Sequence, residues 1–189
     1  MNNLKVVSLI LNGRQVSSPV EPQESLLDFL RNRVGAVEVK CGCNQGDCGT
    51  CTVLFDGKAV KSCLVLALQA EGKEVRTIKG FSGDSLMERL QESFVTSGAI
   101  QCGFCTPGML ISSYAFLKSR PAPTREEIRN AISGNLCRCT GYKKIIDAVE
   151  RVVRETRVEM PSVNDQEPPS PFSEGQEEAK GNYLLLGGG

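Results

Sequence analysis

The sequence predicts an α+β protein in which a β-rich half is followed by a four-helix half. In the first half, short apolar runs alternate with Asn-Gly and Asp-Gly pairs, which are typical of β-hairpin turns. In the second half, apolar residues recur at helical spacing and helix-capping residues precede them. We therefore divide the chain into residues 1–80, residues 81–157 and a tail of residues 158–189.

The β-rich half contains five strand candidates and one short helix. The strand candidates are residues 4–11, 14–17, 52–55, 58–61 and 74–78. The two turn pairs join the first four of these into two hairpins. Ser25 is the expected N-cap of a helix over residues 26–33, whose leucines and phenylalanine would face the core.

The second half contains four helix candidates, each with its own signal. Residues 85–96 carry apolar side chains at helical intervals. Thr106 is the expected N-cap of a helix that has Pro107 at its first position and ends near Ser119. A capping box predicts the next helix over residues 125–132, and a one-sided apolar stripe predicts the last over residues 142–154.

Charge and hydropathy exclude several classes of protein. The chain has 22 basic and 22 acidic residues, so no basic excess indicates nucleic acid. No apolar run approaches the roughly 20 residues that a membrane span needs. The N-terminus shows neither a signal peptide nor a twin-arginine pair. We therefore expect a cytoplasmic protein.

The use of cysteine and histidine is unusual. There are nine cysteines and no histidine among the 189 residues. A reducing cytoplasm disfavours structural disulfides, so this many cysteines indicate metal or redox chemistry. The lack of histidine excludes Ser-His and Cys-His nucleophile pairs and any mixed Cys/His zinc or Rieske site. Any bound metal is therefore expected to have sulfur ligands.

The first group of cysteines is Cys43-x4-Cys48-x2-Cys51, followed by Cys63. This is the spacing of plant-type [2Fe–2S] proteins. Three glycines in and beside the loop would let backbone N–H groups approach an anionic centre. The alternatives are a zinc site or buried free thiols, although zinc ribbons usually have two C-x2-C knuckles and this loop has one.

The second group pairs Cys102-x2-Cys105 with Cys137-x-Cys139. Both pairs come just before predicted helices, whose N-termini offer free N–H donors and the positive end of the helix dipole. Spacing alone leaves zinc open as well as an iron–sulfur cluster. Cys41 is left over, and the simplest interpretation is a thiol without a ligand role.

Three long motifs resemble one family. They are GCNQGDCGTCTVLFDGKAVKSC, QCGFCTPGM and GNLCRCTGY, and the resemblance spans residues 4–155. The chain is similar to the small iron–sulfur subunit of molybdenum hydroxylases, which include xanthine dehydrogenase, aldehyde oxidase and CO dehydrogenase. The resemblance implies a β-grasp plant-type ferredoxin domain, then an all-α four-helix [2Fe–2S]-binding domain. It assigns one [2Fe–2S] cluster to Cys43, Cys48, Cys51 and Cys63, and the other to Cys102, Cys105, Cys137 and Cys139.

The resemblance also implies a role within a larger oxidoreductase. The chain would pass electrons from a molybdopterin-containing large subunit to a FAD-binding medium subunit, in a dimer of heterotrimers. It would carry no catalytic residue of its own. Gln101 matches a position where the family's helical domain meets the pterin, so it would contact molybdopterin. From the residue type alone, Gln101 is equally well a solvated side chain.

Three other functions stay open at this point. The chain could be a free-standing ferredoxin-type carrier, although a carrier needs only one cluster. It could be a zinc-stabilised interaction module, or part of the reductive family branch that acts on aromatic acyl-CoA compounds. The tail has six acidic residues, one lysine and four prolines, which predicts a disordered or partner-wrapping segment with no role inherited from the family.

Overall fold

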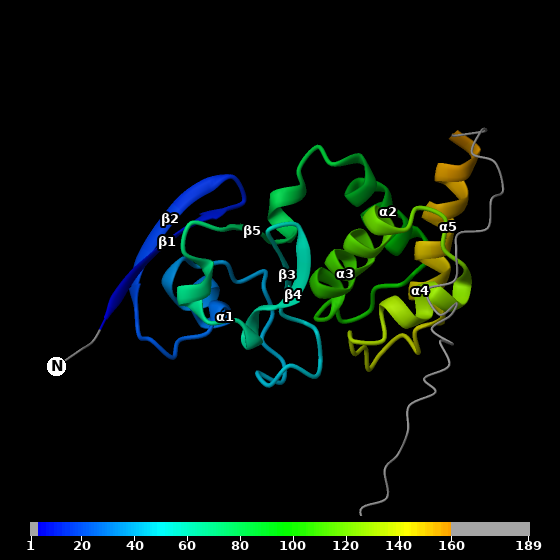
Figure 1. Cartoon of the computed structure of the whole chain (residues 1–189). Coiled ribbons are helices and arrows are strands. Elements are labelled where there is room, and N and C mark those ends of the chain that lie inside the picture. The colour runs from blue at the N-terminus through cyan, green and yellow to red at the C-terminus, as the bar shows by residue number, and fades with distance from the viewer. Residues whose placement is uncertain (1–3, 160–189) are drawn as a thin grey trace, which may run out of the picture. The chain divides into compact units, whose positions relative to one another are not determined.

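The β-rich half is a five-stranded mixed sheet with the strand order β2-β1-β5-β3-β4 (Figure 1). The computed structural model describes residues 4–159, with side chains as far as residue 156. The strands are β1 (Lys5–Leu11), β2 (Arg14–Val20), β3 (Thr52–Phe55), β4 (Lys58–Lys61) and β5 (Glu74–Arg76). β1 is parallel to β5, and all other neighbouring pairs are antiparallel. This is the β-grasp arrangement that the resemblance implies.

Two strands differ in length from the prediction. β2 continues to Val20 because its residues pair with β1 as far as the Lys5–Val20 partners. β5 ends at Arg76, two residues before the predicted end, and a 3-10 helix, η4 (Ile78–Phe81), begins at the last residue of the predicted strand. The Thr77 N–H donates to the side-chain oxygen of Asn12, in the β1–β2 turn, at 2.8 Å. This N–H is therefore not available for a hydrogen bond to a neighbouring strand, as a longer β5 would require.

The short helix predicted over residues 26–33 is divided into two segments. α1 (Leu26–Asp28) has Ser25 as its N-cap, as predicted, and the Asp28 N–H donates to the Ser25 hydroxyl at 3.1 Å. η1 (Phe29–Arg33) is a π-helical turn. This wider turn keeps both Phe29 and the next residue, Leu30, fully buried against the sheet. Two further 3-10 turns, η2 (Ser62–Leu64) and η3 (Ala67–Ala70), were not predicted.

The second half contains the four α-helices that the sequence predicts. They are α2 (Ser85–Thr96), α3 (Thr106–Ser119), α4 (Arg125–Ala131) and α5 (Lys143–Glu159). The predicted capping box of α4 is present, with the Thr124 and Glu127 side chains each accepting from the other's backbone N–H. α5 runs past the predicted end at residue 154, so it includes the first two residues of the predicted tail. The rest of that tail, residues 160–189, lies outside the described residues.

The N-cap of α3 corrects a prediction. Thr106 is the first helical residue, and Cys105 occupies the N-cap position. The Cys105 carbonyl accepts from the Met109 N–H at 3.0 Å, which closes the first turn of the helix one residue earlier than predicted. Pro107 still lies in the first turn, where its missing N–H leaves no intrahelical bond unmade. Cys105 therefore lies directly at the helix start.

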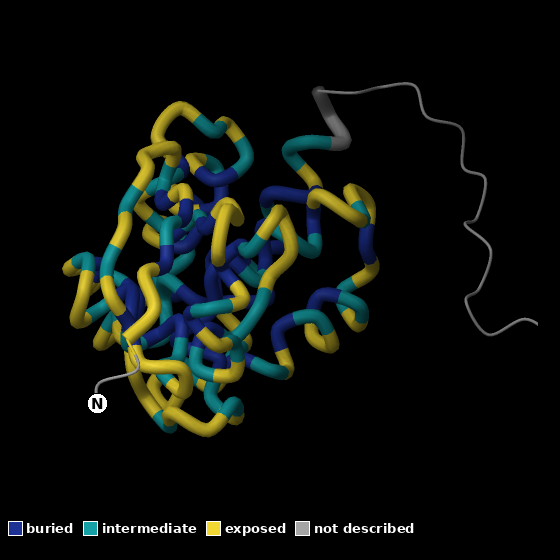
Figure 2. Tube along the Cα trace, turned by 60° about the vertical axis from the view of Figure 1, so that its left-hand side comes forward, coloured by how far each residue is buried: buried dark blue, intermediate teal, exposed yellow. Residues whose placement is uncertain are grey.

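Residues 4–159 lie within one compact unit that contains two hydrophobic cores. One core lies between the sheet and α1, and the other lies among α2, α3, α4 and α5; both appear as dark blue stretches in Figure 2. Strand β3 contributes to both, because neighbouring strand residues face opposite sides: Val53 is in the first core and Leu54 in the second. No helix among the described residues could cross a membrane.

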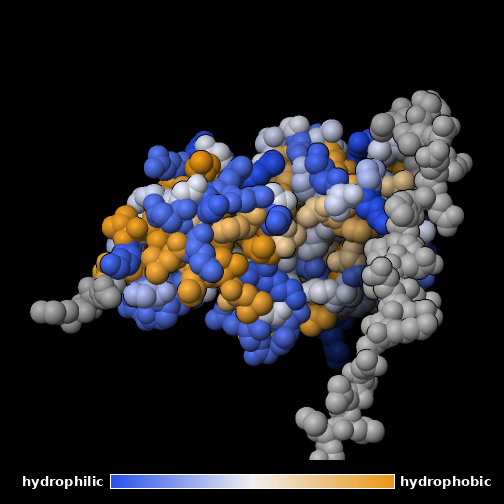
Figure 3. All heavy atoms as spheres, in the orientation of Figure 1, coloured by the Kyte–Doolittle hydropathy of each residue, from blue (hydrophilic) through white to orange (hydrophobic). Residues whose placement is uncertain are grey.

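Several large apolar side chains remain exposed on the β-rich half. Val6 and Ile10 on β1 are exposed by 67% and 42%, and Leu64 and Leu66 by 65% and 43%. Hydrophobic atoms are visible among hydrophilic ones over this half of the face shown in Figure 3. Leu64 lies beside a cysteine loop, because a Cβ added at Gly46 would meet the Leu64 side chain. Part of the apolar surface is therefore next to the candidate site.

Candidate iron–sulfur centres

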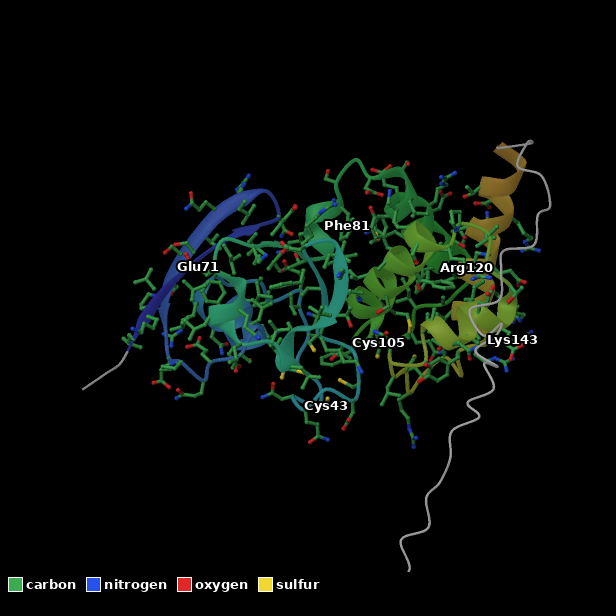
Figure 4. All side chains as sticks on the ribbon, in the orientation of Figure 1. Cys43, Glu71, Phe81, Cys105, Arg120 and Lys143 are labelled. Carbon is green, nitrogen blue, oxygen red and sulfur yellow. The ribbon has the colours of Figure 1, made fainter. Side chains whose placement is uncertain are left out.

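The first group of cysteines, here called the ferredoxin-type site, comprises Cys43, Cys48, Cys51 and Cys63. Three of them belong to the loop between η1 and β3, and the fourth lies in η2, directly after β4. Figure 4 labels Cys43 in that loop, with other sulfur atoms near it. The loop turns tightly because Asn44, Gly46 and Gly49 have φ values of 54°, 91° and 68°.

Backbone N–H groups surround the Cys43 sulfur. Gln45, Asp47 and Cys48 donate to it at 3.5, 3.3 and 3.4 Å. The N–H groups of Cys48 and Gln45 lower the pKa of the Cys43 thiol to about 6. In return, the Cys43 N–H donates to the Cys48 sulfur at 3.4 Å. A loop with this many donors stabilises negative charge on sulfur, as a thiolate-bound cluster requires.

The predicted role of glycine in this loop has a geometric basis at Gly42. A Cβ on Gly42 would lie 2.8 Å from the Cys48 sulfur and 3.0 Å from the Thr50 hydroxyl. Those two atoms already contact each other at 3.3 Å. Glycine therefore makes room for the close approach of backbone and sulfur.

The other two cysteines of the ferredoxin-type site also form a pair. Cys51 is buried and precedes β3, and Cys63 is partly buried. Burial, and then the hydrogen bond and charge of Cys51, raise the pKa of the Cys63 thiol to about 11. Cys48 is therefore the sulfur that affects the Cys43 thiol, whereas Cys51 and, more weakly, Cys43 affect the Cys63 thiol.

The second group, here called the helical site, comprises Cys102, Cys105, Cys137 and Cys139. Cys102 and Cys105 precede α3, and Cys137 and Cys139 precede α5, as predicted. The Cys139 and Cys102 sulfurs are 3.5 Å apart, and Cys137 is the neighbouring sulfur that most affects the pKa of Cys105. Burial, and then Cys137, raise the pKa of the Cys105 thiol to about 12. Figure 4 labels Cys105 at the start of α3.

At each site, a thiol has one neighbouring sulfur that influences it most. Among the described residues, no three His, Cys, Asp or Glu side chains form a group that could hold a single metal ion. Two pairs at each site fit a centre with two irons, in which each iron takes two thiolates. The donor set and the N–H groups around it therefore fit a [2Fe–2S] cluster at each site.

Two residues that support the helical site were not predicted. The Thr140 hydroxyl lies 3.1 Å from the Cys137 sulfur. Burial raises the pKa of the Cys137 thiol, but hydrogen bonds, those with Thr140 first among them, outweigh it and lower that pKa. The Tyr142 hydroxyl accepts from the Cys137 N–H at 2.8 Å. Tyr142 has a φ of 65°, so the chain turns sharply between the cysteines and α5. Both residues lie in the GNLCRCTGY motif, which was the available signal.

The two sites are joined by a direct backbone contact that the sequence did not reveal. The Leu136 N–H donates to the Cys48 carbonyl at 2.8 Å, and Leu136 precedes Cys137. The buried Asn135 side chain donates to the Gly49 carbonyl at 2.9 Å. We call this contact, residues 134–136 against residues 48–49, the junction. It connects a residue of the ferredoxin-type site to the segment that carries the helical site.

Two family models match the chain, one over each half. Residues 9–82 match a 2Fe-2S iron–sulfur cluster binding domain, and residues 77–150 match a [2Fe-2S] binding domain. The nicotinate dehydrogenase small FeS subunit of Eubacterium barkeri is 48% identical over 153 residues, covering 81% of this chain and 97% of the relative. The xanthine dehydrogenase iron–sulfur-binding subunit of Escherichia coli O157:H7 is 44% identical, covering 79% and 96%. The chain belongs to the iron–sulfur subunits of the molybdenum hydroxylase family.

A solved structure gives the same result for the fold of this iron–sulfur subunit. A chain of quinoline 2-oxidoreductase from Pseudomonas putida 86 superposes with a TM-score of 0.76 and 46% identity, covering 84% of this chain and 99% of that one. Together, the two matched domains confirm the prediction of two [2Fe–2S] clusters in this oxidoreductase subunit. The match favours iron–sulfur clusters over the zinc alternative at both sites.

Two further predicted positions of the subunit can now be placed. Gln101 is exposed and directly precedes Cys102. Cys41 is exposed, two residues before Cys43. Neither observation tests the predicted contact of Gln101 with molybdopterin or the predicted lack of a ligand role for Cys41, so both remain predictions.

Proposed function

We propose that this subunit relays electrons within a multisubunit molybdenum hydroxylase. Electrons would pass from a molybdopterin-containing large subunit to the helical site, then to the ferredoxin-type site, and then to FAD on a medium subunit. The observation that carries this proposal is the junction, where the Leu136 N–H meets the Cys48 carbonyl at 2.8 Å. Relatives described as small, beta and gamma subunits support the presence of partner chains.

We propose that all eight cysteines of the two sites are cluster ligands. One iron of the ferredoxin-type cluster would take Cys43 and Cys48, and the other would take Cys51 and Cys63. At the helical site, the pairs would be Cys102 with Cys139, and Cys105 with Cys137. The contacts between these sulfurs support the pairing. When bound, each cluster supplies one-electron transfer.

The junction gives the relay a short path through this chain's own atoms. From the Cys48 sulfur the path follows the residue's own bonds to its carbonyl, crosses one hydrogen bond to Leu136, and continues to the adjacent Cys137. Asn135 is buried and holds the segment in place through its bond to Gly49. A free-standing carrier would not need two sites joined in this way.

We propose that the two sites belong to two domains, residues 1–80 and residues 81–157. In this proposal Gln101 faces the pterin of the partner, where its carboxamide could both donate and accept hydrogen bonds. Its exposure beside Cys102 supports this position. Gln101→Ala is expected to leave both clusters intact but to slow their reduction by substrate.

The relatives support a proposal for the substrate class and the assembly. Relatives are described as acting on nicotine, nicotinate and xanthine, so we propose a nitrogen heterocycle as the substrate class. We also propose that the enzyme is a dimer of heterotrimers. We place it in the cytoplasm, because free thiols and cluster assembly suit a reducing compartment. Sedimentation of the purified complex would test the stoichiometry.

The relay can be tested by breaking it at either site. In the purified complex, Cys48→Ser should leave reduction of the helical centre by substrate intact but leave FAD oxidised. Cys137→Ser should leave both the ferredoxin-type centre and FAD oxidised. Rapid mixing with substrate, followed by absorbance and EPR, measures each centre. Reduction of FAD at the wild-type rate in either variant would contradict the proposed order.

A further inference from the structure

We propose that Lys61 is a positioning residue that raises the reduction potential of the ferredoxin-type centre. It would do so through one peptide group of the cysteine loop, without contacting the cluster. The inference rests on the proposed function only in assuming that Cys43 is a ligand of that centre.

A chain of two hydrogen bonds links Lys61 to Cys43. The Lys61 ammonium donates to the Gly46 carbonyl at 2.6 Å. That carbonyl belongs to the same peptide group as the Asp47 N–H, which donates to the Cys43 sulfur at 3.3 Å. The cation and the sulfur therefore lie at opposite ends of a single amide.

A cation on the carbonyl oxygen makes the N–H of the same amide a stronger donor. Linked hydrogen bonds polarise one another in this way, more strongly away from bulk water. Reduction adds an electron to a centre that already carries negative charge. A stronger N–H···S bond and a nearby positive charge both stabilise the reduced form, and so raise the potential.

The surroundings leave the charge of Lys61 available for this role. Lys61 is partly buried at the end of β4, and the described ion pairs do not include it. The acidic side chain in the loop, Asp47, accepts instead from the Gln45 side chain at 2.7 Å. A Cβ on Gly134 would lie 3.6 Å from the Lys61 nitrogen, so the ammonium also lies beside the junction.

The chain offers a matched control on the same strand. Lys58 also belongs to β4, but it is exposed, and its side chain is in none of the hydrogen bonds or ion pairs of the described residues. Lys58→Met removes the same formal charge as Lys61→Met. A difference between these variants therefore reports the contact with Gly46 rather than the net charge of the protein.

The test is an EPR-monitored redox titration of both centres in the full-length chain. Lys61→Met should shift the ferredoxin-type centre to a more negative potential and move the helical centre less. Lys61→Gln, which keeps a donor but loses the charge, should shift it by an intermediate amount. Lys61→Arg should restore most of the wild-type potential, and Lys58→Met should shift neither centre.

Two results would overturn the proposal. One is an unchanged potential of the ferredoxin-type centre in Lys61→Met, or in Lys61→Gln if the methionine variant does not assemble its cluster. The other is an equal shift in Lys61→Met and Lys58→Met. Because the potentials are measured without partner subunits, a failure here is separate from a failure of the relay, which is measured as FAD reduction in the complex.

Discussion

The ferredoxin-type site takes three of its four cysteines from one loop, whereas the helical site takes two from each of two segments far apart in the sequence. The loop surrounds Cys43 with its own N–H groups. Each site also has a threonine hydroxyl beside a sulfur, Thr50 at Cys48 and Thr140 at Cys137, and at the helical site Tyr142 additionally holds the Cys137 N–H. The first site is therefore mainly a local structure, and the second depends on how α3 and α5 are brought together.

The largest effect expected is the loss of one centre without the other. Cys48→Ser should remove the ferredoxin-type cluster and Cys137→Ser the helical cluster, because the proposed ligand assignment gives each site its own cysteines. Each variant should retain about half of the iron and acid-labile sulfide, with one EPR signal after reduction. Loss of both signals in either variant would show that the two sites assemble as one unit.

The second prediction concerns the packing of α3 against the ferredoxin-type loop. A Cβ on Gly108 would meet the backbone carbonyls of Gly49 and Thr50, which cannot move independently of the loop. Gly108→Ala should lower the free energy of unfolding by about 1–3 kcal/mol, although alanine normally favours a helix. Chemical denaturation measures this difference.

Gly134→Ala is the control for that change. A Cβ there would lie 3.6 Å from the flexible end of Lys61, an ordinary contact distance. Its effect should therefore stay within about 1 kcal/mol. If Gly134→Ala lowered the free energy of unfolding more than Gly108→Ala, the junction, and not the packing of α3, would limit stability.

The third prediction concerns Asn135, whose side chain links the segment of the helical site to the loop of the ferredoxin-type site. Asn135→Ala removes its bond to Gly49 and should cost about 1–2 kcal/mol of unfolding free energy. It should also slow electron transfer between the centres, because Leu136 is then held less firmly against Cys48. Flash reduction followed by absorbance measures the rate. The exposed Asn130→Ala on α4 is the control and should change neither quantity.

The smallest effect is expected at Cys41. The thiol is exposed, and the ferredoxin-type site already has four sulfurs arranged in two pairs. Cys41→Ala should therefore keep the wild-type iron content and both EPR signals. If it lost the ferredoxin-type signal while Cys43→Ala kept it, the ligand assignment would be wrong by two residues.

Signals that act over a few residues were predicted well. The Ser25 cap, the Thr124 capping box and the apolar stripe of α5 were all found. Two of the local errors occurred where a residue or element outside the segment intervened. Asn12 takes the Thr77 N–H and ends β5 early, and the packing of Phe29 and Leu30 against the sheet accompanies a π turn. Asn12, for example, lies 65 residues from Thr77 in the sequence.

The sequence by itself determined the cysteine spacing, the order of the two halves and the family, because each depends on residue types at fixed short intervals. Tertiary structure alone decided which sulfurs pair across segments, that Leu136 meets Cys48, and that Lys61 reaches Gly46. Each of these contacts joins segments that are distant in the sequence, and the packing of α3 against β3 and β4 accompanies the contact of Leu136 with Cys48. A hydrogen bond requires its atoms to lie within about 3 Å, and no periodicity along the chain reports that distance.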